Sequence, residues 1–148
     1  TDIDLCVMNL GGLRTSLSKG TINKGKVFEL MPFDNALVIV ELTAEELIEL
    51  GNHILALGGE PIAAPGGVRL TPTGFQFKDT SRQRKSKYRI LTSDYLANGG
   101  DRFSIFTKAT HREVTTILIR DALIECFANY TSQSQPLVAN VDGRIQLN

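Results

Sequence analysis

The sequence predicts one α+β domain over residues 1–148, on three observations. A chain of 148 residues has the length of one domain and can bury a hydrophobic core. Its 42% hydrophobic and 22% charged residues are typical of a globular protein. Short strand-like runs are interrupted by two separated amphipathic helices, which favours mixed sheets over a repeated strand–helix unit.

Strands are predicted where β-branched and aromatic residues cluster between turn-forming residues. The expected strands cover residues 5–8, 37–42, 67–70, 75–78 and 88–93, with another around Val114 and one or two within residues 137–147.

Two helices are predicted from their caps and apolar spacing. The first begins after Thr43, which forms a capping box with Glu46, and runs to about Leu57. The second covers about residues 116–130, and a short helix is expected near residues 24–30. The apolar stripe of the second is predicted to face the core; it comprises Ile119, Ala122, Leu123, Cys126, Phe127 and Tyr130.

Charge and cysteine content argue against several classes of protein. The 16 basic residues balance 16 acidic ones, so no overall positive field favours nucleic acid. No run approaches the roughly 18 apolar residues that span a bilayer. The basic run at residues 82–87 is interpreted as a solvated hairpin tip, with a nucleic-acid patch as the alternative. Cys6 and Cys126 are predicted to be buried free thiols.

The most informative segment is residues 95–101, Tyr-Leu-Ala-Asn-Gly-Gly-Asp, which follows the strand expected at residues 88–93. Such a loop can lay a flat ligand on Tyr95 and bond it through Asp101, while the glycines permit close approach or positive φ. The alternative is a hairpin turn in which Asn98 and Gly99 supply the turn geometry.

Two earlier segments also carry ligand-binding residue types. Residues 9–14, Asn-Leu-Gly-Gly-Leu-Arg, follow an apolar strand, so the turn can aim backbone N–H groups at an anion and Arg14 can add a fork of donors. Residues 31–35, Met-Pro-Phe-Asp-Asn, place Phe33 at the mouth of the next strand. Phe33 there is either a ligand contact or simply part of the core.

In chain order, these segments resemble the C-terminal substrate-binding domain of the 5′-nucleotidase family. The likeness extends to residues 66–69, Gly-Gly-Val-Arg, to residues 119–125 and to residues 142–145, and so covers nearly the whole chain. The resemblance implies a layered α/β/β/α fold with mixed sheets and a periplasmic or extracellular location.

The resemblance also implies roles for individual residues. Phe33 and Tyr95 match the two aromatic positions that sandwich the nucleobase, and Asp101 matches the carboxylate that binds the ribose hydroxyls. Stacking on a ring is tolerant of the base and contributes about 1–3 kcal/mol per partner.

The remaining candidate substrate-binding residues surround this clamp. Asn9 matches an amide at the base edge, and Arg14 matches an arginine that reaches toward the phosphate. Gly67 matches a stretch that lines the base pocket through its backbone, and Asn98 belongs to the same loop as Asp101.

Two departures from the family pattern stand out. Arg102 follows Asp101 where relatives usually have Gly. The family's other phosphate-binding arginine lies upstream of Asn9, beyond the start of this sequence. The domain is therefore expected to be truncated at its N-terminal edge and to lack that contribution to phosphate binding.

No catalytic residue, metal ligand or cofactor is predicted within the chain. His53 and His111 have no His or Cys partner at ligand spacing. In the family, hydrolysis belongs to a metallophosphatase domain with a pair of divalent metal ions, which would be fused upstream or supplied by a separate chain. That reading makes this chain one part of a hydrolase acting on a nucleoside 5′-monophosphate or related nucleotide. One alternative is that the chain is a stand-alone nucleoside- or nucleotide-binding module. Another is that it binds a related substrate, such as a nucleotide sugar or cyclic nucleotide.

Overall fold

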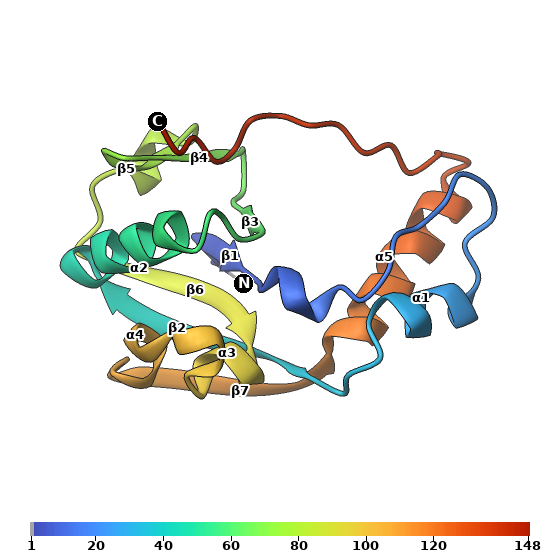
Figure 1. The fold of residues 1–148 in the computed structure, drawn as a ribbon, viewed down its shortest axis with the longest axis horizontal. Helices are drawn as coiled ribbons and strands as arrows, with labels where there is room; N and C mark the ends of the chain where they lie inside the picture. The colour runs from blue at the N-terminus through green and yellow to red at the C-terminus, as the bar shows by residue number, and fades with distance from the viewer. Residues whose placement is uncertain (1) are drawn as a thin grey trace.

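The computed structural model describes residues 2–148 and contains two sheets (Figure 1). The larger sheet is five-stranded, in the order β3-β1-β6-β2-β7. Its strands are β1 (Leu5–Val7), β2 (Ala36–Thr43), β3 (Ile62–Ala63), β6 (Lys87–Ser93) and β7 (His111–Leu118). Strands β1 and β6 run parallel and the other neighbours antiparallel, so the predicted α+β class with mixed strand directions is confirmed.

The smaller sheet pairs β4 (Val68–Thr71) with β5 (Gly74–Phe77), and helix α2 (Ala44–Ala56) lies between it and the larger sheet (Figure 1). Gly51 lets α2 approach the small sheet closely, because a Cβ there would lie 3.1 Å from Leu70 and 3.2 Å from Phe75. The buried residues of α2 and of both sheets form one hydrophobic core.

The predicted cap of α2 is confirmed in both of its hydrogen bonds. The backbone N–H of Glu46 donates to Thr43 Oγ1 at 3.2 Å, and the N–H of Thr43 donates to the Glu46 carboxylate at 2.8 Å. The short helix expected near residues 24–30 is α1 (Lys24–Leu30). Two further short helices, α3 (Asp94–Ala97) and α4 (Ser104–Thr107), connect β6 to β7.

Helix α5 (Ile119–Ser132) differs from its prediction in both start and burial. It begins three positions late because β7 continues to Leu118, which pairs with Ala36. Only Ile119 and Arg120 of α5 are buried, since the helix packs on α1 at one end of the molecule (Figure 1). The expected core stripe is therefore wrong beyond Ile119, and Cys126 is exposed rather than buried.

Residues 137–147 do not form the expected strands. After α5 the chain crosses the molecule as an irregular segment and ends beside β4 (Figure 1). Only Ile145 makes a β-bridge, with Leu70, where the Gln146 N–H donates to the Leu70 carbonyl at 2.9 Å.

The basic run at residues 82–87 is not a solvated hairpin tip, because it connects strands of two different sheets. Two of its cations reach Asp4, which is completely buried and directly precedes β1. Arg82 Nη1 lies 2.8 Å from Asp4 Oδ1, and Lys85 Nζ lies 2.8 Å from Asp4 Oδ2. The Arg89 backbone N–H donates to the same carboxylate at 2.9 Å.

Candidate functional site

A cavity of about 710 Å³ opens where the segment after β1, the segment before β2 and the segment after β6 meet. Five of the predicted site residues line it, although they come from three separate parts of the sequence. The lining residues are Asn9, Gly11, Gly12, Arg14, Pro32, Phe33, Asp34, Asn35, Tyr95 and Asp101.

The two aromatic side chains at the cavity are half-exposed. Phe33 is 43% exposed and Tyr95 is 44% exposed, so Phe33 is not the simple core residue that its type alone would favour. Large apolar rings left open in a cavity offer faces on which a flat ligand can stack.

Asp101 joins residues from distant segments at the edge of this cavity. Its Oδ2 accepts a 2.9 Å hydrogen bond from Asn9 Nδ2, and its Oδ1 accepts a 2.9 Å bond from the Tyr95 hydroxyl. The bond to the carboxylate raises the pKa of Tyr95, because the protonated phenol is the form that donates. Each carboxylate oxygen keeps a second lone pair for a ligand hydroxyl.

The two glycines of the loop serve different purposes. Gly99 has φ +90°, in the left-handed region that favours glycine. Gly100 permits contact instead, since a Cβ there would lie 2.6 Å from the Tyr95 ring. The loop continues through α4, and β6 and β7 each pair with β2, so the hairpin alternative for residues 95–101 is wrong.

The Gly-Gly turn near the N-terminus forms a short 3₁₀ helix over Leu10–Gly12. The Leu10 N–H donates to the Glu60 carboxylate at 2.5 Å, and the Arg14 N–H donates to the Leu30 carbonyl at 2.8 Å. The Arg14 guanidinium contacts only the Gly11 carbonyl, at 3.4 Å, and makes no ion pair within residues 2–148. Its fork is thus available at the cavity wall.

Asp94 connects the segments that carry Phe33 and Tyr95. Its Oδ1 accepts 2.8 Å hydrogen bonds from Asn35 Nδ2 and from the Tyr95 backbone N–H. Sequence reasoning missed this link, although Ser93 ends a strand and Asp94 follows it in the pattern of a helix start, which could have marked the residue.

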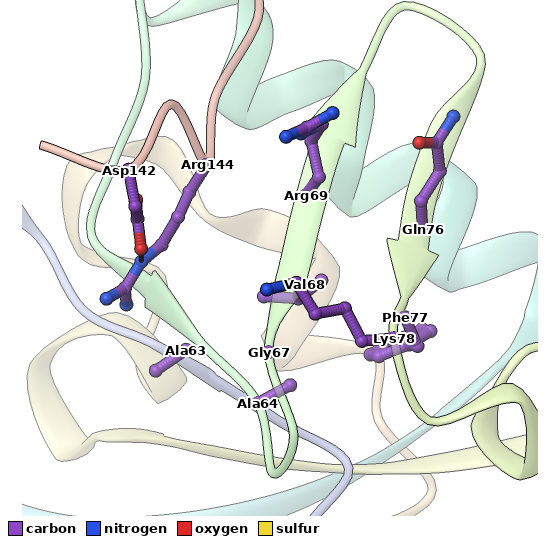
Figure 2. Close-up of a pocket in the computed structure, with 10 residues that line it drawn as sticks. All are labelled: Ala63, Ala64, Gly67, Val68, Arg69, Gln76, Phe77, Lys78, Asp142 and Arg144. Atoms are coloured by element: carbon purple, nitrogen blue, oxygen red, sulfur yellow. Dashed lines mark hydrogen bonds and ion pairs between the residues drawn. The ribbon is translucent and has the colours of Figure 1, made fainter.

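Two predicted site residues are not brought to this cavity. Asn98 turns to β7, where its Oδ1 accepts a 2.9 Å hydrogen bond from Arg112. Gly67 directly precedes β4 and borders a second cavity of about 540 Å³, beside the Lys78 side chain (Figure 2). The second cavity lies between the small sheet and the segment that carries Asp142 and Arg144 (Figure 2).

The two histidines have neighbours other than metal ligands. His53 Nε2 lies 3.3 Å from the Asp101 carbonyl, and its ring packs edge-on against Phe103. His111 begins β7. Among residues 2–148, no cluster of three His, Cys, Asp or Glu side chains has the arrangement of a metal site.

No helix among the described residues combines the length and apolarity needed to cross a bilayer.

Comparisons with known proteins agree with this architecture. The family model for the 5′-nucleotidase C-terminal domain matches residues 1–52. A trifunctional nucleotide phosphoesterase protein of Bacillus subtilis is 26% identical over 160 residues, covering 96% of this chain and 11% of that protein. An apyrase of Tabanus yao is 27% identical over 171 residues, covering 99% of this chain and 30% of the apyrase.

The structural comparison also covers nearly the whole chain. The crystal structure of a 5′-nucleotidase precursor from Thermus thermophilus matches with a TM-score of 0.71 and 25% identity, over 97% of this chain and 31% of that one. The family model, the relatives and this crystal structure together support a relation of the chain to the C-terminal domain of the 5′-nucleotidase family. It spans 11% and 30% of the lengths of the two relatives above.

Proposed function

We propose that this chain is the substrate-specificity domain of a 5′-nucleotidase-type phosphohydrolase and binds a nucleoside 5′-monophosphate or a related nucleotide. One observation carries the proposal: Phe33, Tyr95 and Asp101 line one open cavity although Phe33 is far from the other two in sequence. Ring faces suit a nucleobase, and a carboxylate suits paired ribose hydroxyls. The cavity volume lies within the range of about 300–1,000 Å³ that is common for small-molecule sites.

Arg14 supports a phosphate at the same site. A guanidinium binds an oxyanion through two parallel N–H donors, and this one has no carboxylate partner among the described residues. We expect AMP to bind more tightly than adenosine if Arg14 reaches the phosphate, and equally if a further cation is required.

The chemistry is assigned to a metallophosphatase domain with a pair of divalent metal ions, in a periplasmic or extracellular protein. The similarity to the 5′-nucleotidase family supports both assignments. A stand-alone binding module is the second candidate, since all the cavity residues come from this chain. Metal-dependent AMP hydrolysis by the longest natural form of the protein, lowered by Phe33→Leu, would favour the hydrolase over the stand-alone module.

Calorimetry with adenosine and AMP tests the binding proposal directly. We expect both to bind, and expect Phe33→Leu and Tyr95→Leu each to weaken binding about tenfold or more, the loss of one stacking partner. Tyr130→Leu is the matched control, because Tyr130 is a partly exposed aromatic residue on α5 that does not line the cavity. Absence of nucleoside binding at millimolar concentration would contradict the proposal.

A further inference from the structure

A buried arginine at the start of α5 holds the segment that carries Phe33. Arg120 is only 7% exposed. Its Nη1 donates to the carbonyls of Phe33 at 3.2 Å and Met31 at 3.4 Å, while Nη2 pairs with the Asp34 carboxylate. One side chain thus contacts three of the four residues between α1 and Asn35.

The guanidinium is also fixed from its flat side. Its Cζ lies 4.1 Å from the centroid of the Phe28 ring on α1, a cation–π arrangement. A planar group held between a ring and several oxygens has one orientation, which the single ammonium of lysine cannot reproduce. Arg120 therefore fixes the direction of the loop as well as its charge.

The next residue along the loop is held by the same helix end. The Ile119 backbone N–H donates to the Asn35 carbonyl at 2.9 Å. The Phe33 ring is half-exposed and does not belong to the buried core, so core packing does not fix its position. The position of the ring is therefore set mainly by the backbone of the loop.

We infer that Arg120 is a positioning residue that sets the place of the Phe33 ring in the cavity and thereby the affinity for the base. This role rests on the proposed function, because it needs a nucleoside to stack on Phe33. Arg120 does not line the cavity and would act only through the loop.

Arg120→Lys tests the inference, with adenosine affinity by calorimetry and stability by urea unfolding. We expect about tenfold weaker binding, because a displaced ring loses much of its stacking contact. Arg82→Lys is the matched control, since Arg82 is another shielded arginine that pairs with carboxylates but lies away from the cavity. It should lower stability and leave adenosine affinity unchanged.

A double-mutant cycle separates positioning from general loosening of the fold. In a Phe33→Leu background, Arg120→Lys should cause little further loss of affinity, because the ring it positions is gone. In a Tyr95→Leu background the loss should persist. Equal losses in both backgrounds would overturn the inference in favour of a merely structural role.

The outcomes distinguish this inference from the proposed function. If the unaltered protein binds no nucleoside, the proposed function fails. If it binds adenosine and Arg120→Lys binds equally well, only the role of Arg120 fails. Should Arg120→Lys not fold, Phe28→Leu replaces it: Phe28 is half-exposed and outside the cavity, and its loss should still weaken adenosine binding about twofold or more as the guanidinium loses its support. Unchanged affinity in that variant would also overturn the role.

Discussion

The Tyr95 hydroxyl donates a 2.9 Å hydrogen bond to Asp101 Oδ1, and the Tyr95 ring packs against Gly100, the residue before Asp101. The ring and the carboxylate are consequently one unit, with the aromatic face and the acceptor oxygens set by the same contact. A neutral phenol is needed for that bond, which raises the pKa of Tyr95.

Tyr95→Phe should therefore lower stability in a pH-dependent way. A group whose pKa is raised on folding contributes stability below its unfolded pKa, about 10 for tyrosine, and loses it as pH rises through the folded value. The difference in unfolding free energy between the two proteins should be constant at neutral pH and shrink above about pH 10. Urea unfolding across this range measures it. Tyr130→Phe, whose hydroxyl makes no hydrogen bond within residues 2–148, should show no such trend.

Asp101→Asn should reduce selection for the ribose. The amide keeps the shape of the carboxylate but removes its charge and one acceptor oxygen, so the hydroxyls lose charge-assisted bonds. We expect about tenfold weaker adenosine binding and little change in binding of 2′,3′-dideoxyadenosine. Calorimetry with both ligands measures the difference. Asp142→Asn, outside this cavity, is the control, and equal weakening for both ligands would contradict a ribose contact.

Arg102→Gly should stabilise the protein by up to about 1 kcal/mol, because a non-glycine residue in the left-handed region is strained. Arg102 has φ +63° and follows Asp101 at φ +50°, so two neighbouring residues share this conformation. Thermal or urea unfolding measures the gain. Arg84→Gly, at an exposed position without positive φ, should lower stability instead. A loss of stability in Arg102→Gly would show that its side chain contributes more than its backbone costs.

Local patterns were sufficient for much of this fold and site. The capping box of α2 and the β-branched run of β2 each involve only a few neighbouring residues, and both elements form as predicted. Five site residues belong to compact motifs whose chemistry is visible without a partner, and the structure brings them to one cavity.

The remaining features depend on contacts that no local pattern encodes. Arg120 and Asp34 are 86 positions apart, and Arg82 and Asp4 are 78 positions apart. Helical periodicity shows that α5 has an apolar face, but not that α1 rather than a sheet covers part of it. Gly67 borders a different cavity from the other site residues for a similar reason, because the β4–β5 pair packs on α2.

Asp4→Asn should destabilise the protein by about 3 kcal/mol, toward the low end of the cost of breaking a buried ion pair. The carboxylate is completely buried, whereas the side chains of Arg82 and Lys85 keep 16% and 31% exposure and can be partly solvated after its loss. Urea unfolding measures the cost. Asp79→Asn is the control, because Asp79 also pairs with Arg82 but is 40% exposed, and it should cost much less. Equal costs would mean that the burial of Asp4 contributes nothing.

The two thiols should differ sharply in reactivity. Burial raises the pKa of Cys6, in β1 between β3 and β6, to about 11, and only the thiolate reacts readily. Cys126 is exposed on α5. At pH 8 in the folded protein, a thiol reagent such as iodoacetamide should modify Cys126 and leave Cys6 intact, as mass spectrometry of the peptides can show. In urea both should react, since unfolding returns Cys6 to water. Cys126→Ser should abolish labelling of the folded protein, and rapid labelling of Cys6 in that variant would mean that β1 opens to solvent.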